Sequence, residues 1–201
     1  TAYYALVQRG SLKRGESLLV LGAGGAIGYA ATEIGKALGA HVIGSVSDTR
    51  RELALRAGAD ATIDSRSVSW RDDVKAANGG EPIDVALDPV GGNSTEPAFR
   101  SMAWNGRHLV IGFVAGSIPK IPANLAFLKV AALIGVDVRQ FGEREPDAAT
   151  RNIEALFGLY REGQLHPPIG RRYPLAQFAA AMDEAFQGTG TGRIVLTMRD
   201  R

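Results

Sequence analysis

An apolar run passes directly into a group of glycines in the stretch Leu18-Leu19-Val20-Leu21-Gly22-Ala23-Gly24-Gly25-Ala26-Ile27-Gly28. The apolar part predicts a buried strand, and the alanine-rich part that follows predicts a helix. Glycines at this junction allow a tight turn and let backbone N–H groups approach a phosphate, because no Cβ stands in the way. The stretch therefore predicts a diphosphate-binding turn at the first strand-to-helix connection.

The spacing of these glycines departs from the usual dinucleotide motif. GxGxxG would need glycine at position 27, where the chain has Ile27; Gly22, Gly25 and Gly28 give GxxGxxG instead. We expect Gly28 to let the helix pack closely on the strand. Dinucleotide binding is the favoured interpretation, and the alternatives are a glycine-rich turn that only packs and an adenosylmethionine site.

The end of the predicted second strand indicates which dinucleotide binds. An NAD site places a carboxylate there for the ribose 2′-OH, but this strand ends at Ser47 and the nearest acid, Asp48, comes too late. Arg50 and Arg51 follow at once. A serine hydroxyl and a guanidinium suit a 2′-phosphate, so we expect NADP(H). The alternative is that both arginines are solvated in the first turn of a helix, where cations are unfavourable.

Three further strand ends carry candidate residues. Ser65 and Arg66 follow the third strand and are candidates for the 2′-phosphate pocket. Glycine-rich loops over 88–92 and 112–116 follow the fourth and fifth strands. Ligands bind at the carboxyl ends of such strands, so we expect these loops near a nicotinamide and its ribose. Asp88 precedes a proline, which favours a turn or capping role over acid–base catalysis.

Short aliphatic runs alternate along the chain with amphipathic stretches, which is typical of a parallel sheet with helices on both faces. Predicted strands occupy residues 17–21, 41–46, 60–63, 83–87, 107–111 and 133–138. Predicted helices occupy residues 26–38, 50–57, 68–77, 95–103 and 124–130. We therefore expect an α/β fold with a doubly wound parallel six-stranded sheet of the Rossmann type, and the strand over 133–138 at its edge.

The pattern changes from Glu145 onward. A long helix is predicted after Pro146, then a proline-rich link at 166–168, a helix over 175–186 and a closing strand over 193–198. We divide the chain into a dinucleotide-binding domain over 1–144 and a C-terminal segment over 145–201. A segment of this size cannot build its own core, so we expect it to pack against a part of the protein outside this chain.

Composition limits the classes of partner. The chain of 201 residues is 45% hydrophobic and 22% charged, with a formal net charge of +2, so nucleic acid is not an expected partner. No apolar run is long enough to predict a membrane span. The sequence has no cysteine and three dispersed histidines, so no metal site is expected here, and a reducing cytoplasm is the expected location.

Motifs along nearly the whole chain occur in the order seen in one superfamily. They are Thr1–Leu6, Gly22–Gly28, Leu38–Ala40, Ala57–Asp60, Asp88–Gly92, Gly106-Arg107, Ile111–Phe113 and Gly192–Leu196. The chain thereby resembles the medium-chain dehydrogenase/reductases, and most closely the zinc-free, zeta-crystallin-like quinone oxidoreductases. The resemblance implies an NADPH-dependent reductase that transfers hydride to a quinone or to another conjugated carbonyl, such as an enone.

The resemblance also implies roles for individual residues. It places Ala23, Gly24, Gly25, Ala26 and Ile27 at the pyrophosphate, Ser47 and Arg50 at the 2′-phosphate, and Val90, Gly112, Phe113 and Val114 near the nicotinamide. Arg50 stands where the family often has lysine, which preserves the charge, and Ser65 stands where a tyrosine often lies near the adenosine. No catalytic acid or base is expected, because holding the hydride donor against an electron-poor carbon supplies much of the catalysis.

The resemblance implies that the protein has further parts. In the family, a preceding GroES-like domain supplies most of the substrate cleft, and the segment over 145–201 returns to this catalytic domain, which is truncated here. Thr1–Leu6 reads as the interior of a helix without an initiator methionine, so we expect an N-terminal part to be missing and this chain alone to be inactive. Zinc ligands of zinc-dependent relatives also come largely from that part.

The sequence also predicts an oligomeric state and leaves two alternative functions open. An apolar edge strand and the resemblance both predict a homodimer whose sheets join edge to edge. The first alternative to a reductase is an NADP(H)-binding sensor or interaction module without turnover. The second is a relative of the zinc-dependent alcohol dehydrogenases.

Overall fold

The computed structural model describes residues 1–188, 190 and 192–198. The chain forms two compact units, Thr1–Leu165 and His166–Arg201. The helix after Pro146 packs with the first unit, where Gln8 Nε2 donates to Asn152 Oδ1 at 2.6 Å. The predicted division after residue 144 concerns the domains of a longer protein and stays a prediction.

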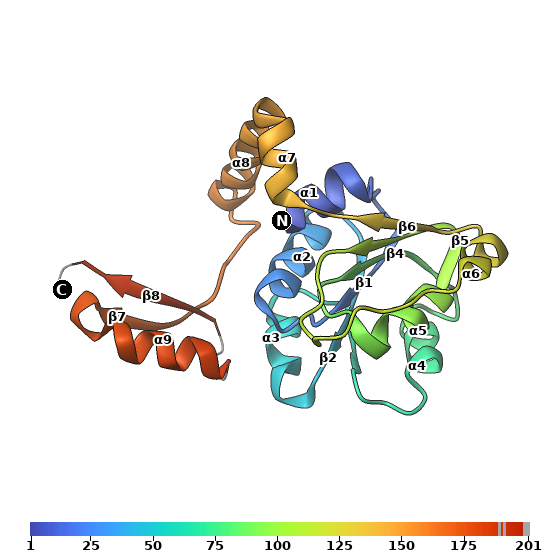
Figure 1. The fold of residues 1–201 in the computed structure, drawn as a ribbon, viewed down its shortest axis with the longest axis horizontal. Helices are drawn as coiled ribbons and strands as arrows, with labels where there is room; N and C mark the ends of the chain where they lie inside the picture. The colour runs from blue at the N-terminus through green and yellow to red at the C-terminus, as the bar shows by residue number, and fades with distance from the viewer. Residues whose placement is uncertain (189, 191, 199–201) are drawn as a thin grey trace. The chain divides into compact units, whose positions relative to one another are not determined.

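A six-stranded parallel sheet forms the centre of the first unit (Figure 1). In spatial order its strands are β3 (Ala61–Asp64), β2 (His41–Val46), β1 (Ser17–Leu21), β4 (Ile83–Asp88), β5 (Met102–Val110) and β6 (Ala132–Gly135). Every neighbouring pair is parallel. The predicted doubly wound α/β fold is confirmed, and β6 lies at the edge as expected.

Helices precede, connect and follow the strands of the first unit. They are α1 (Ala2–Tyr4) continued by a π-helical turn (Ala5–Arg9), α2 (Ala26–Ala37), α3 (Arg51–Arg56), α4 (Trp70–Ala77), α5 (Thr95–Arg100), α6 (Ala123–Lys129), α7 (Val138–Arg144) and α8 (Pro146–Arg161). Short 3₁₀ turns, Asp48–Arg50 and Gly92–Ser94, precede α3 and α5. Within the described part of the chain, no helix combines the length and apolar character that crossing a bilayer requires.

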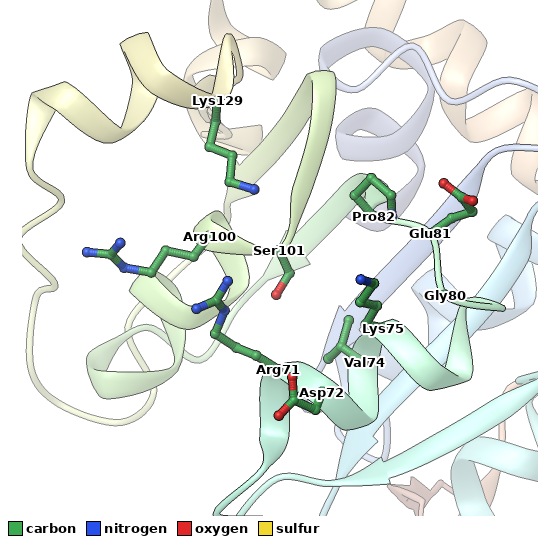
Figure 2. Close-up of a pocket in the computed structure, with 10 residues that line it drawn as sticks. All are labelled: Arg71, Asp72, Val74, Lys75, Gly80, Glu81, Pro82, Arg100, Ser101 and Lys129. Atoms are coloured by element: carbon green, nitrogen blue, oxygen red, sulfur yellow. The ribbon is translucent and has the colours of Figure 1, made fainter.

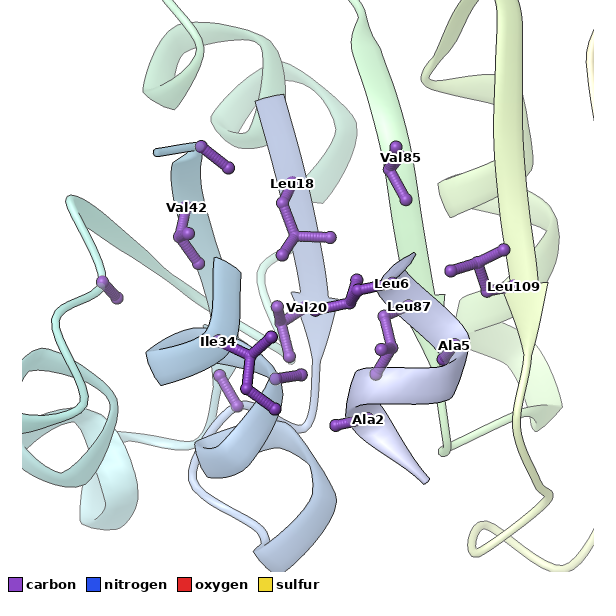
Figure 3. Close-up of a cluster of buried hydrophobic side chains, with 14 of the residues drawn as sticks. Ala2, Ala5, Leu6, Leu18, Val20, Ile34, Val42, Val85, Leu87 and Leu109 are labelled. Carbon is purple, nitrogen blue, oxygen red and sulfur yellow. The ribbon is translucent and has the colours of Figure 1, made fainter. Parts of the chain in front are cut away.

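Alternate side chains of the central strand β1 face opposite sides of the sheet. Leu18 and Val20 join one buried cluster together with Ile34 of α2 (Figure 3). Leu19 and Leu21 join a second cluster with Phe99 of α5. Helices therefore cover both faces of the sheet, and this is why the strand reads as a continuous apolar run in the sequence.

The strand expected over 133–138 ends earlier than predicted. β6 stops at Gly135, and Asp137 caps α7 by accepting hydrogen bonds from the backbone N–H groups of Arg139 and Gln140, both at 3.0 Å. Gln140 Nε2 donates back to the Asp137 carboxylate at 2.9 Å. An acid followed three residues later by glutamine resembles a capping box, and this local signal lies inside the apolar run that predicts a strand.

The helix expected over 95–103 is shorter than predicted, and the following strand is longer. α5 ends at Arg100, and β5 begins at Met102, which pairs with Ile83 and is 1% exposed. The pairing with β4 is irregular before Arg107, and Asn105 has a φ of 58°. Burial of Met102 in the sheet outweighs the helical propensity of the segment.

The second unit contains a strand that was not predicted. β7 (Ile169–Pro174) pairs in parallel with β8 (Arg193–Thr197), and a 3₁₀ turn (Leu175–Gln177) and α9 (Phe178–Gln187) connect them. Ala181 is the only buried residue among those described in this unit. The unit therefore has no core of its own, as its size predicted. Residues 189, 191 and 199–201 of the predicted C-terminal segment lie outside the described residues.

Candidate functional site

Backbone hydrogen bonds shape the glycine turn that joins β1 to α2. Gly22 N donates to Ser45 O at 2.9 Å, and Gly25 N donates to Gly22 O at 2.8 Å. Helix α2 begins at Ala26, and within the described residues no side chain caps it. Its first three N–H groups, those of Ala26, Ile27 and Gly28, have no acceptor one turn earlier. Together with the helix dipole they form a site suited to a diphosphate.

Two of the glycines are required by their neighbours. A Cβ on Gly28 would lie 2.2 Å from Gly22 O, so only glycine lets α2 approach the turn this closely, as expected. A Cβ on Gly24 would lie 2.5 Å from the Cβ of Arg50. Ala23 and Ile27, the other positions of the turn, are buried and half-buried. Packing of the turn thus explains the glycines at positions 24 and 28.

Arg50 reaches the glycine turn from the loop after β2. Its Nη1 donates to Gly24 O at 3.1 Å. Ser47 ends the extended segment, and its hydroxyl lies 3.2 Å from Thr49 Oγ1. Asp48 contacts Arg51 Nη2 at 3.4 Å and is largely exposed. The structure therefore brings Ser47 and Arg50 to the same edge as the turn, with no carboxylate at the last position of β2.

Ser65 and Arg66 lie one strand further from the turn. Ser65 N donates to Val46 O at 2.8 Å, which places it beside the end of β2. Arg66 N donates to Asp64 Oδ1 at 3.0 Å. Both residues are exposed, and neither side chain has a hydrogen bond to the glycine turn among the described contacts. They lie beside the end of β2, and their part in a 2′-phosphate pocket stays a prediction.

The loops after β4 and β5 are joined to each other and to the turn. Ala115 N donates to Val90 O at 2.9 Å. A Cβ on Gly22 would lie 3.0 Å from Val90 Cγ2, so Val90 borders the glycine turn. Gly112, Phe113 and Val114 follow the end of β5, and Phe113 lies against Gly91. The candidate residues near the nicotinamide therefore lie on the same sheet edge as the turn.

Asp88, at the end of β4, is buried and fully hydrogen-bonded. Its Oδ1 accepts from Val90 N at 2.9 Å and from Gly91 N at 2.8 Å. Its Oδ2 accepts from Thr95 Oγ1 at 2.6 Å and lies 3.2 Å from His108 Nε2. Burial acts to raise the pKa of Asp88, but the hydrogen bonds from His108, Gly91 and Thr95 outweigh it and hold the pKa below its usual value. The carboxylate thus stabilises the turn that follows β4, in line with the expected turn role of Asp88.

The contact of His108 with Asp88 was not predicted from the sequence. His108 lies inside β5 with 0% exposure, and its ring packs 5.9 Å from that of Phe99. Because a carboxylate oxygen only accepts, Nε2 carries the proton in the pair with Asp88. The two positions, 88 and 108, are brought together by the pairing of β4 with β5. Strand register, which a single sequence does not reveal, decides this contact.

The first unit has hollows at both edges of the sheet. One, of about 640 Å³, adjoins the ends of β5 and β6 and includes Phe113 and Phe141 in its lining. Another, of about 410 Å³, contains four basic side chains, Arg71, Lys75, Arg100 and Lys129 (Figure 2). It borders the segments that enter β4 and β5, so it lies at the opposite edge from the glycine turn. Lys75, Arg100 and Lys129 occupy the last turns of α4, α5 and α6, where cations offset the helix dipoles.

The described residues do not assemble a metal site. Nowhere in the described part of the chain do three or more histidine, aspartate or glutamate side chains gather so that they could hold a metal ion. His41 is exposed and contacts Ala77 O at 3.1 Å, and His166 is exposed in the second unit. The donor set for zinc is therefore not found among these residues, and no zinc role is assigned to them.

Comparison with known proteins identifies the family of this chain. A family model described as zinc-binding dehydrogenase matches residues 26–154. The chain belongs to the medium-chain dehydrogenase/reductase superfamily and is quinone oxidoreductase-like. The dehydrogenase/reductase chain is 31% identical over 201 residues to quinone oxidoreductase-like protein 2 of Bos taurus, covering 99% of this chain and 58% of that protein.

Solved structures share the fold of this dehydrogenase/reductase chain. A probable oxidoreductase from Mycobacterium abscessus superposes with a TM-score of 0.85 at 35% identity, covering 98% of this chain and 58% of that one. A mycobacterial protein complexed with NADPH superposes with a TM-score of 0.86 at 26% identity, covering 97% and 61%. The chain thus spans less than two thirds of the length of the relatives it matches.

Proposed function

We propose that this chain is the NADP(H)-binding part of an oxidoreductase that transfers hydride to a quinone or to another conjugated carbonyl. The observation that carries the proposal is the contact of Arg50 with the glycine turn, beside a β2 end that has no carboxylate. A guanidinium in this place suits a 2′-phosphate, and the absent carboxylate removes the usual partner of a free 2′-OH.

Each candidate residue has a proposed part in holding the cofactor. The backbone of Ala23 to Ile27 binds the pyrophosphate at the start of α2. Ser47 and Arg50 bind the 2′-phosphate, with Ser65 and Arg66 at its outer side. Val90 and the segment 112–114 lie along the nicotinamide and its ribose.

The reduced nicotinamide supplies the hydride when the cofactor is bound. The residues of this chain bind and orient it, and none of them is proposed as a catalytic acid or base. Positioning the donor against an electron-poor carbon accounts for much of the rate in such a reaction. The acceptor site and a zinc-free catalytic domain belong to the longer protein, to which the exposed apolar side chains of α9, such as Phe178 and Phe186, would dock.

We also propose that two copies associate through β6. This strand lies at the edge of the sheet, and its Leu133 side chain is 48% exposed. An unpaired apolar edge favours strand addition. A cytoplasmic location, expected from the sequence, stays a prediction.

A fluorescence titration with NADPH and NADH tests the cofactor assignment. We expect NADPH to bind at least about tenfold more tightly than NADH, because the free energy of one charge-assisted hydrogen bond corresponds to about a tenfold change in the dissociation constant. Tighter binding of NADH by the same factor would refute NADP(H). Turnover is tested on the full-length protein with quinone and enone acceptors; NADPH binding without oxidation by any of them would favour the sensor alternative.

A further inference from the structure

The Asp88 carboxylate joins three separate segments at the sheet edge. Its four hydrogen bonds reach the loop after β4 through Val90 and Gly91, the start of α5 through Thr95, and β5 through His108. Asp88 is 1% exposed and His108 0% exposed, so water does not compete for these bonds. Charge-assisted hydrogen bonds in such surroundings are stronger than exposed ones.

The loop that Asp88 holds is in turn attached to the loop after β5. Gly91 has a φ of 71°, and a Cβ there would lie 2.9 Å from Phe113 Cδ1. Gly92 N donates to Ser117 O at 3.1 Å, and Ala115 N donates to Val90 O at 2.9 Å. These contacts join the two loops, and the Asp88 side chain ties the first of them to the buried sheet.

Among the described residues, the hydrogen bonds of the glycine turn do not run to the loop after β4, although Val90 packs against the turn at Gly22. Its hydrogen bonds run to Ser45 of β2 and within the turn itself. Its side-chain contact with Arg50 comes from the loop after β2. The site thus consists of two parts held by different hydrogen bonds: an adenosine-diphosphate part over β1 and β2, and a nicotinamide part over β4 and β5.

We propose that Asp88, with Thr95 and His108, is a positioning group that fixes the nicotinamide part of the site independently of the adenosine part. This inference rests on the proposed binding of NADP(H). Loss of the carboxylate frees the loop over 89–92 and the segment 112–114 attached to it. The cofactor then retains its diphosphate and 2′-phosphate contacts but loses the ordered surface against its nicotinamide half.

Asp88→Asn is the direct test, because the amide keeps the shape but offers one acceptor atom in place of two. In one orientation its NH₂ group faces the N–H donors of Val90 and Gly91; in the other it faces Thr95 and His108, and in both the negative charge that strengthens the four bonds is lost. Thr95→Val removes one donor from the network at nearly constant volume, and Thr95→Ser keeps the hydroxyl and is the matched control. Each variant is titrated with NADPH and with 2′,5′-ADP, which carries the 2′-phosphate but no nicotinamide. Amide hydrogen exchange at Val90 and Gly91 is measured without ligand.

We expect Asp88→Asn to weaken NADPH binding by about tenfold or more, the size of one lost charge-assisted hydrogen bond, and to leave 2′,5′-ADP within about twofold of wild type. Thr95→Val weakens NADPH by a smaller factor, Thr95→Ser restores it, and exchange at Gly91 accelerates in the variants that lose NADPH affinity. If Asp88→Asn does not fold, the Thr95 pair carries the test.

Equal weakening of both ligands would overturn the proposal, because it would show general damage to the fold. Unchanged NADPH binding in the variants would also overturn it. A wild-type chain that binds neither ligand would instead contradict the proposed function itself, and the inference would fall with it.

Discussion

Arg50 lies across the glycine turn, with its Nη1 donating to Gly24 O at 3.1 Å and its Cβ in the space that a side chain at position 24 would occupy. The residue proposed to select the 2′-phosphate therefore also packs against the turn proposed to hold the diphosphate. We expect this contact to couple binding at the two places.

Gly24→Ala is predicted to weaken NADPH binding by at least about tenfold. Its Cβ would lie 2.5 Å from Arg50 Cβ and 3.1 Å from Arg50 O, so the turn and the arginine must separate. Calorimetric titration measures the loss. Gly142→Ala is the control, since a Cβ at that helical position meets nothing within 4 Å; it should bind as wild type and be slightly more stable. Wild-type affinity in Gly24→Ala would contradict the placement of Arg50.

Arg50→Ala is predicted to reduce the affinity for NADPH by about 10- to 100-fold, the range of a charged hydrogen-bonded contact, and to change NADH affinity far less. Parallel fluorescence titrations with the two cofactors give the ratio. Arg51→Ala is the matched control, because Arg51 contacts Asp48 and not the turn. An equal loss for both cofactors would mean that Arg50 supports the turn without reading the 2′-phosphate.

The ion pair of Glu16 and Arg107 predicts a pH-dependent part of the stability. Arg107 Nη2 lies 2.6 Å from Glu16 Oε2, and both side chains are about four fifths buried. Burial acts to raise the pKa of Glu16, but the hydrogen bonds from Arg107 and Lys13 N outweigh it, so the pKa lies below its usual value of 4.5. Because the folded-state pKa is lowered, this stabilisation is present above pH 4.5 and is lost as the pH falls through the folded-state pKa.

Glu16→Gln is therefore predicted to lower the free energy of unfolding by about 1–3 kcal/mol at pH 7, and by progressively less below the usual glutamate pKa. Urea unfolding of both proteins at a series of pH values measures the difference. Glu154→Gln, an exposed change on α8, should have little effect at any pH. A difference that is constant with pH would exclude the ionised pair as its cause.

Leu133→Lys is predicted to convert a dimer into a monomer. A lysine on the edge strand opposes pairing with another strand. Light scattering of the wild type should give twice the chain mass of 21.3 kDa, and the variant should give the single mass. Leu128→Lys, on the exposed face of α6, is the control and should remain dimeric. A monomeric wild type at working concentrations would refute the edge-to-edge assembly.

The sheet was predictable because its strands are buried on both faces and therefore read as uninterrupted apolar runs. β1 and β2 have the expected boundaries, Ser17–Leu21 and His41–Val46. The boundary errors occur where a local signal competed with a longer pattern. Asp137 caps a helix inside an apolar run. Met102 lies at the end of a segment with a helical pattern but pairs with Ile83 in the sheet.

The candidate site was predictable as a set of strand ends, but not as a set of contacts. The sequence placed the glycine turn, Ser47 and Arg50, and the loops after β4 and β5, at the carboxyl ends of parallel strands. Contact between Arg50 and Gly24 depends on the loop path after β2, and contact between Asp88 and His108 depends on strand register. Neither the path of this loop nor the strand register can be derived from local propensity or periodicity.

A crystal structure of the chain grown with NADPH tests the central claim most directly. The account predicts the diphosphate at the N–H groups of Ala26 and Ile27, and the 2′-phosphate within hydrogen-bonding distance of the Arg50 guanidinium. A glycine turn that stays empty at saturating NADPH, or a 2′-phosphate that lies away from Arg50, would contradict it.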